Sequence, residues 1–450
     1  MKRWHGILAL LLAFCLLLPM GCGKSTEAPR DMEPYYDRAE TVLTAFCEED
    51  YGAITALFDA TMQQTLGTER LAEAYEGIKK TKGAFVKEVA RASEVQEDYV
   101  VVVLTCLHEN GYLDLRVVFD GEKRISGLQL LESKGPKDTT PPPQGVLEKE
   151  VSFGTEAYSL KGTLSYPESA QEPVPVVVLV HGSGPCDRDE SVGPTRPFRD
   201  IAWGLGQRGI AVLRYDKRTY TYATACAVEV AADRFTVREE TMDDALLAVE
   251  YARHLTEFTP GPVYLLGHSL GAMLVPRMAE EADAAGYIML AAPAQPLEDL
   301  ILMQYTYLLS LDTATPQVEK DAQLASVCAQ VENIKRLEPG DHQMNKDLLG
   351  MNPAYLLDLK EYDPVTAAVA MTQPLLILQG GRDYQVPLSD FETYQKALAG
   401  RENVTCVSYE KLNHLFCEGE GERSIPQEYI AGGSVPDYVI DEIASFIRNH

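Results

Sequence analysis

A G-x-S-x-G motif lies at residues 267–271, between an apolar run and a segment of helical character, and its serine is Ser269. In this pattern the serine sits on a tight turn between a strand and a helix, and small flanking residues let the two elements approach closely. The N-terminus of the following helix points at the serine, where it stabilises developing negative charge. We therefore interpret Ser269 as a nucleophile for acyl transfer.

A serine nucleophile needs a base, and the chain contains eight histidines. His414 is the candidate, because it lies in the segment LNHLF directly after the last predicted strand. The other seven histidines are assigned to other places: His5 to the leader, His108 to the N-terminal domain, His181 to the loop at the start of the sheet, His254 to a helix end, His268 to the far side of the serine turn, His342 to the cap and His450 to the terminus.

The orienting carboxylate is predicted to be Asp383, in the segment GGRDYQVP that follows a predicted strand at 374–378. The carboxyl end of such a strand is where an open α/β sheet collects its functional groups. Of the rivals, Asp390 is interpreted as a first-turn acid of a helix, and Asp358 and Asp363 precede the strand. The chain order of serine, aspartate and histidine is that of α/β hydrolases.

An oxyanion pocket needs two backbone N–H donors. One is predicted to be Leu270, directly after the nucleophile, and the other to come from the segment HGSGPCDRDE that follows the first buried strand. Ser183 is the candidate there, with Gly184 as the alternative. The charged residues of the same segment are interpreted as salt bridges that fix the loop (Asp187, Arg188 and Asp189).

The elements that must position these residues alternate between strand and helix over 148–450, which is typical of a mostly parallel sheet covered on both faces. Predicted strands lie at 151–153, 160–166, 174–180, 210–214, 263–266, 287–290, 375–378 and 404–407. The clearest helices lie at 239–255 and 435–447. From 296 to 362 a helical stretch intervenes, and we interpret it as a cap.

Several apolar and aromatic side chains of the cap are candidates for an acyl pocket, and packing of the cap on the sheet explains them equally well (Met303, Tyr305, Tyr307, Met351 and Tyr355).

Ahead of this domain, residues 35–132 change from a helical to a strand pattern. Three predicted helices end near residue 83, and four strands follow, at 85–89, 99–107, 112–119 and 125–131. This indicates an α+β domain with no nucleophile or metal cluster of its own. The segment 133–147 contains three consecutive prolines and is predicted to be a stiff linker.

Residues 1–21 have a basic head, Lys2 and Arg3, and an apolar run of twelve residues at 7–18. Twelve residues are too few to span a bilayer, so the segment is predicted to be a secretory signal peptide. It ends before Cys22 and resembles a bacterial lipoprotein signal, although Pro19 stands where that family usually has Leu. The resemblance implies a lipid on Cys22 and a membrane-anchored extracytoplasmic protein. Residues 22–34 are predicted to be a short tether, because 27–33 is polar and prolines stand at 29 and 34. Plain secretion is the alternative.

The formal net charge of the 450 residues is −27. This argues against binding of nucleic acid and against electrostatic docking on an anionic membrane. The nine cysteines are irregularly spaced without a C-x-x-C pair, which does not favour a zinc site or a disulfide framework.

The segments HGSGPCDRDE, RYDKRTYTY, GHSLGA, GGRDYQVP and NHLF together resemble a bacterial α/β-hydrolase group of secreted carboxylesterases, related to the dienelactone-hydrolase and prolyl-oligopeptidase-like branches. The resemblance covers 151–450, and the preceding domain resembles the small helix-and-sheet domain found ahead of some secreted hydrolases. It implies an α/β-hydrolase fold. From the triad we predict hydrolysis of esters of small or short-acyl substrates through an acyl-enzyme, without metal or organic cofactor.

Three alternatives remain. A thioesterase is chemically close, and a serine peptidase would use the same triad, although about 100 helix-and-strand residues do not encode a gating propeller. A third possibility is an anchored envelope-binding protein with an idle hydrolase.

Overall fold

The computed structural model describes residues 32–96, 99–133, 135–136, 139–169, 171–313, 315–341 and 348–450. The predicted signal peptide, Cys22, the tether up to residue 31 and His342 lie outside these residues. The chain divides into two compact units, Met1–Thr140 and Pro141–His450, and each has its own hydrophobic core.

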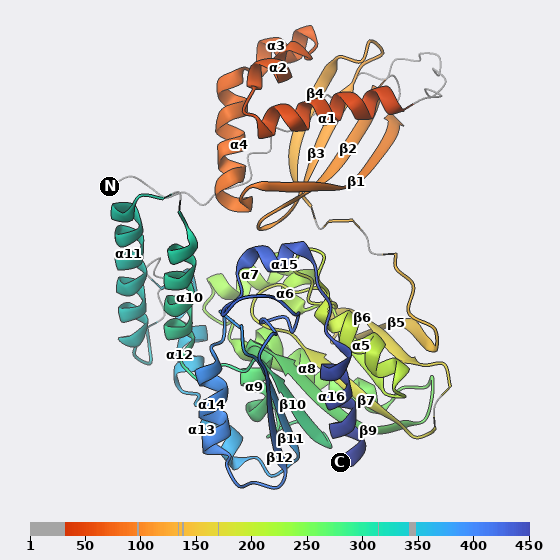
Figure 1. The fold of residues 1–450 in the computed structure, drawn as a ribbon, viewed down its shortest axis with the longest axis vertical. Helices are drawn as coiled ribbons and strands as arrows, with labels where there is room; N and C mark the ends of the chain where they lie inside the picture. The colour runs from red at the N-terminus through yellow and green to blue at the C-terminus, as the bar shows by residue number, and fades with distance from the viewer. Residues whose placement is uncertain are drawn as a thin grey trace. The chain divides into compact units, whose positions relative to one another are not determined.

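The first unit packs helices against an antiparallel meander in the order β1-β2-β3-β4 (Figure 1). Its described elements are α1 (Glu33–Cys47), α2 (Tyr51–Ala56), α3 (Ala60–Thr65), α4 (Thr68–Lys82), β1 (Phe85–Gln96), β2 (Tyr99–His108), β3 (Gly111–Phe119) and β4 (Ile125–Ser133). Alternate residues of β3, including Leu115 and Val117, enter the core beside Phe46 of α1. This alternation is expected for a sheet with one buried face.

Two predictions for this unit were wrong in detail. The described residues hold four helices rather than three, because α3 buries no side chain and so carries no apolar period. Strand β1 continues to Gln96, well beyond the predicted residue 89. Its second half is polar because this strand lies at the sheet edge and its side chains are largely exposed.

The second unit is built on an eight-stranded sheet in the order β12-β11-β10-β9-β7-β8-β6-β5. Pairs from β12 to β8 are parallel, whereas β6 pairs antiparallel with both β8 and β5. The strands are β5 (Val146–Gly154), β6 (Ser159–Pro167), β7 (Val174–Val180), β8 (Ala211–Tyr215), β9 (Pro260–His268), β10 (Gly286–Leu290), β11 (Leu375–Gly380) and β12 (Val404–Tyr409). Strand β5 therefore begins inside the segment predicted as linker.

Helices cover both faces of this sheet (Figure 1). Those before the cap are α5 (Pro197–Gln207), α6 (Arg218–Thr221), α7 (Ala223–Ala231), the π-helical turn η1 (Arg238–Met242), α8 (Asp243–Arg253) and α9 (Leu270–Met278). Those after it are α13 (Pro364–Ala370), α14 (Leu388–Ala397), α15 (Pro426–Ala431) and α16 (Asp437–Asn449). The predicted helix at 239–255 is thus a π-helical turn followed by an α-helix.

The continuous apolar run of β7 feeds two cores. Val176, Val178 and Val180 pack with α8 and α9, whereas Val177 and Leu179 pack with α5 and α16. Successive side chains of a strand point to opposite faces, so a strand covered on both sides is apolar throughout.

The cap lies between β10 and β11 and consists of α10 (Leu297–Leu311), α11 (Gln317–Lys335) and α12 (Pro353–Lys360). Helices α10 and α11 lie side by side (Figure 1). Within the described residues, no helix has the length and apolar character needed to cross a bilayer.

Strands β7, β9 and β11 are parallel to one another, so their carboxyl ends lie at the same edge of the sheet. The loops after these strands carry Ser183, Ser269 and Asp383. The topology therefore brings three segments that are far apart in the sequence to one edge.

Candidate active site

Ser269 stands between β9 and α9 with φ 53° and ψ −119°, a conformation that non-glycine residues rarely adopt. The flanking glycines allow this turn. A Cβ on Gly271 would lie 2.4 Å from the carbonyl oxygen of Val180, and a Cβ on Gly267 would lie 2.4 Å from the carbonyl oxygen of Gly271. These are backbone atoms that cannot move aside, so the motif is required by close packing at the turn.

Asp383 and His414 are in contact. Nδ1 of His414 lies 2.7 Å from Oδ2 of Asp383, and the aspartate side chain is completely buried. Oδ1 accepts the backbone N–H groups of Gln385 and Val386 at 2.7 and 2.9 Å, and Nε2 of Gln379 donates to Oδ2 at 3.1 Å. Because the carboxylate accepts at Nδ1, the proton of a neutral His414 is placed there and Nε2 keeps its lone pair.

The three rival aspartates are engaged elsewhere. Asp390 accepts from the backbone N–H of Ala294 and the side chain of Gln295, Asp358 pairs with an arginine of α9 at 2.8 Å, and Asp363 caps α13.

His268 links the serine turn to the segment of His414. Its Nε2 lies 2.9 Å from the carbonyl oxygen of His414, and its Nδ1 lies 2.9 Å from Oε2 of Glu190. Burial by itself lowers the pKa of His268, but the Glu190 carboxylate and the carbonyl of His414 outweigh burial and raise that pKa. His268 is therefore part of the scaffold that joins three loops.

His181 is fully enclosed beside Phe198 and Tyr215. Burial lowers the pKa of His181 to about 4, although Glu190 opposes the shift. The imidazole is therefore neutral at neutral pH, and its enclosed position does not suit proton transfer to a substrate.

The segment 182–184, which we call the oxyanion loop, packs against Ser269. A Cβ on Gly182 would lie 3.1 Å from Cβ of Ser269. The N–H of Gly182 donates to Oε1 of Glu190 at 2.6 Å, and the N–H of Gly184 donates to Oε1 of Glu240 at 2.9 Å. For the N–H of Ser183, the described residues offer no acceptor. The N–H of Gly184, the predicted alternative donor, is therefore already used.

Leu270 is the first residue of α9, and its N–H has no acceptor within the helix. It borders the same cavity as Ser183 and Ser269. Ser183 and Leu270, whose N–H groups have no acceptor among the described residues, thus line one cavity together with Ser269.

Ion pairs hold the rest of the HGSGPCDRDE segment. Arg188 pairs with Asp216 and Glu150, and Asp189 pairs with Arg214. Asp187 has no ion-pair partner among the described residues; its Oδ1 instead accepts the backbone N–H groups of residues 189 and 191. Asp187 thus fixes the loop through backbone hydrogen bonds rather than through the predicted salt bridge.

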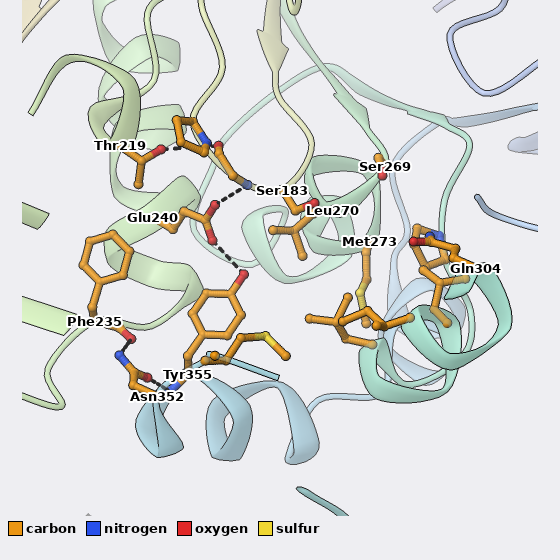
Figure 2. A pocket seen from close by; sticks show the side chains of 18 of the residues that line it. Ser183, Thr219, Phe235, Glu240, Ser269, Leu270, Met273, Gln304, Asn352 and Tyr355 are labelled. Atoms are coloured by element: carbon orange, nitrogen blue, oxygen red, sulfur yellow. Dashed lines mark hydrogen bonds between the residues drawn. The ribbon is translucent and has the colours of Figure 1, made fainter. Parts of the chain in front are cut away.

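A cavity of about 570 Å³ opens beside Ser269 (Figure 2). Its apolar lining comes from α7 and the loop after it, from α9 and from the cap (Val230, Phe235, Leu270, Met273, Leu297, Leu300, Ile301 and Met351). Among the described residues that line it, Glu240 is the one with a charged side chain. The cavity therefore suits an apolar group.

Of the five cap residues considered from sequence, Met351 and Tyr355 line this cavity. Met303, Tyr305 and Tyr307 are not among its lining residues. The hydroxyl of Tyr305 donates to Gln323 of α11, and that of Tyr307 donates to the carbonyl of Ser424. The apolar and aromatic residues of α10 that do not line the cavity thus serve to pack the cap.

Sequence reasoning missed Glu190, Lys217 and Glu240, whose buried side chains contact the oxyanion loop. Glu190 and Lys217 lie in the motifs HGSGPCDRDE and RYDKRTYTY, but no local pattern assigns their partners. No group of three or more potential metal-ligating side chains occurs in the described part of the chain.

Residues 177–423 match the alpha/beta hydrolase family, and residues 39–128 match a family of unknown function, DUF3887. Esterase EstD of Thermotoga maritima is 36% identical over 403 residues, which cover 89% of this chain and 92% of that protein.

Among solved structures, an esterase of Pyrococcus furiosus is similar at 16% identity and a TM-score of 0.44, over 70% of this chain and 96% of its own. Est1E of Butyrivibrio proteoclasticus is similar at 18% identity and a TM-score of 0.43, over 67% of this chain and 99% of its own.

The match of the alpha/beta hydrolase model to more than half of the chain and the extent of the relationship to EstD confirm the predicted fold class. The chain therefore belongs to the alpha/beta hydrolase family, as a hydrolase with a curated relative that is an esterase.

Proposed function

We propose that the protein hydrolyses carboxylic esters with Ser269 as nucleophile, His414 as base and Asp383 as orienting acid. The observation that carries the proposal is the 2.7 Å contact between Asp383 and His414, at the edge of the sheet where Ser269 occupies its strained turn. A carboxylate at Nδ1 fixes the tautomer of the imidazole and stabilises its cation.

In this mechanism Oγ of Ser269 attacks the ester carbonyl carbon while Nε2 of His414 takes the hydroxyl proton. The N–H groups of Leu270 and Ser183 donate to the tetrahedral oxyanion. When the intermediate collapses, the C–O bond to the alcohol breaks and His414 returns the proton to the leaving oxygen. Water activated by His414 then hydrolyses the acyl-enzyme.

The cavity supports a substrate with a small or short apolar acyl group. Its lining is mostly apolar, and its single carboxylate, Glu240, is paired with Lys217 at 2.7 Å. An ionised acyl group would lose its hydration there without gaining a free countercharge. The esterase relative points to the same class of bond.

The direct test measures kcat/KM of the purified protein over p-nitrophenyl esters of increasing acyl length, an acyl thioester and an aminoacyl anilide. We expect short esters to be turned over best and the Ser269→Ala variant to be inactive while remaining folded. Equal ester hydrolysis by Ser269→Ala would refute the proposal. Preference for the thioester or the anilide would reassign the leaving group.

We also propose that the protein is held at the membrane by lipid on Cys22. The short apolar run behind a basic head and the Gly-Cys junction support this. The Cys22→Ser variant should then appear in the soluble fraction, and its continued sedimentation with membranes would contradict the anchor.

A further inference from the structure

A buried ion pair holds the oxyanion loop on both sides of Ser183. Lys217 and Glu240 are 1% and 5% exposed, and Nζ of Lys217 lies 2.7 Å from Oε1 of Glu240. Nζ also donates to the carbonyl oxygen of Gly182 at 2.7 Å, and Oε1 accepts the N–H of Gly184 at 2.9 Å. The peptide groups before and after Ser183 are therefore fixed by one pair of charges.

The second carboxylate oxygen of Glu240 is held by the cap. The hydroxyl of Tyr355, on α12, donates to Oε2 at 2.6 Å. Figure 2 shows the Glu240 carboxylate between the oxyanion loop and Tyr355. Every oxygen of this carboxylate thus has a donor, and the two donors outside the ion pair come from the oxyanion loop and from the cap.

The position of Tyr355 is itself fixed. Asn352 caps α12 by accepting the N–H of Tyr355 at 2.7 Å, and its Nδ2 donates to the carbonyl oxygen of Phe235 at 3.1 Å. Asn352, Phe235 and Tyr355 all line the cavity. A substrate group that fills the cavity therefore touches the segment that holds Glu240.

A role in stability alone explains this arrangement poorly. A buried ion pair stabilises a fold little more than apolar side chains of the same volume do. Apolar side chains, however, cannot fix a carbonyl and an amide at either end of one residue. Glu240 also stands on the π-helical turn η1, and such turns occur often at functional sites.

We propose that Glu240 and Lys217 are positioning residues that aim the N–H of Ser183 at the oxyanion, and that Tyr355 makes this alignment depend on the cap. The inference rests on the proposed function, because it presumes an oxyanion next to Ser269. It assigns to the cap a second role besides forming the wall of the cavity.

The test is the Tyr355→Phe variant, which removes one hydroxyl and leaves the Lys217–Glu240 pair intact. Tyr438→Phe is the control. Tyr438 lies on α16, is exposed and is not among the residues that line the cavity, and its hydroxyl also donates to a glutamate, Glu418, at 2.9 Å. The readouts are kcat, KM and the affinity for a trifluoromethyl ketone, which forms an oxyanion on the nucleophile, relative to the corresponding methyl ketone.

We expect Tyr355→Phe to lower kcat by about tenfold, less than the 10²–10³ lost with a whole oxyanion donor. KM should change by less than about twofold, and the preference for the trifluoromethyl ketone should fall by the same factor as kcat, since both report on the oxyanion. Tyr438→Phe should match the wild type. An unchanged kcat, or a changed KM with an unchanged ketone preference, would overturn the proposal.

A second variant, Lys217→Met combined with Glu240→Gln, removes both charges and leaves an amide oxygen for Gly184. It should reduce kcat more than Tyr355→Phe does, because the carbonyl of Gly182 loses its donor. If this variant does not fold, Tyr355→Phe still decides the question.

The Ser269→Ala variant separates the two proposals. If Ser269→Ala retains turnover, the proposed function fails. If Ser269→Ala is inactive but Tyr355→Phe equals the wild type, only the positioning role fails.

Discussion

Nε2 of His268 lies 2.9 Å from the carbonyl oxygen of His414, so the residue before Ser269, the proposed nucleophile, is hydrogen-bonded to the backbone of His414, the proposed base. His268 also lies 2.9 Å from Glu190, which accepts the N–H of Gly182 in the oxyanion loop. One buried glutamate and one buried histidine therefore connect the three loops of the site. Changes to this pair should affect both stability and activity.

The pair should stabilise the fold in a limited pH window. The pKa of His268 is raised above its usual 6.5. The contribution of His268 to the unfolding free energy is therefore fully present below pH 6.5 and is lost as the pH rises through the raised pKa. Burial raises the pKa of Glu190, but His268 and the N–H of Gly182 outweigh burial and lower it below 4.5. Its contribution is present above that value and is lost as pH falls through the lowered pKa.

Between the lowered pKa of Glu190 and the raised pKa of His268, the Glu190→Gln variant should therefore have an unfolding free energy about 3 kcal/mol below that of the wild type, as expected when a buried ion pair is broken. The deficit should shrink as the pH rises through the raised pKa of His268. Urea unfolding at pH 5.5 and pH 9 measures this. Glu281→Gln, which breaks an exposed pair with Arg238 at 2.8 Å, is the control and should cost less than about 1 kcal/mol. A Glu190→Gln deficit that is the same at both pH values would contradict the assignment.

Asp383→Asn should reduce kcat by about 10³–10⁴-fold with little change in KM, because an amide at this position favours the wrong tautomer of His414. Asp390→Asn is the matched control: that carboxylate is also buried but accepts from Ala294 and Gln295 instead. Steady-state kinetics on a short ester compares them. A greater loss in Asp390→Asn would show that the acid has been misassigned.

Gly271→Ala should destabilise the second unit by at least about 2 kcal/mol, because its Cβ would meet the backbone oxygens of Val180 and His181 at 2.4 and 2.5 Å. Gly77→Ala on α4 meets no atom within 4 Å and should stabilise the first unit by about 1 kcal/mol. Scanning calorimetry of the full chain measures both. If Gly271→Ala unfolds at the same temperature as the wild type, the close approach of residue 271 to the backbone of Val180 and His181 is contradicted.

Residues with a local signal were predictable from the sequence. The run at 174–180 identified a central strand because it is buried on both faces, and G-x-S-x-G located the serine turn because its glycines meet backbone atoms. Helix α3 was not predicted because it buries no side chain and therefore has no apolar pattern in the sequence.

The contacts around the oxyanion loop depend on tertiary structure. Glu240 binds Gly184 across 56 positions of the chain, and Lys217 binds Gly182 across 35. From sequence, Glu240 is an acid at the start of a helix, where acids are common on electrostatic grounds alone. A single sequence therefore gave candidates for the triad but did not identify the pair that holds the loop between them.

The most direct measurement of the central claim is covalent labelling of the full chain with a fluorophosphonate, which reacts with a serine activated by a neighbouring base. Intact-mass and peptide analysis should show one adduct per chain, on the peptide that contains Ser269, and no adduct in Ser269→Ala. Asp383→Asn should be labelled much more slowly than the wild type. An adduct on another serine, or labelling of Ser269→Ala at the wild-type rate, would contradict the assignment of Ser269 as nucleophile.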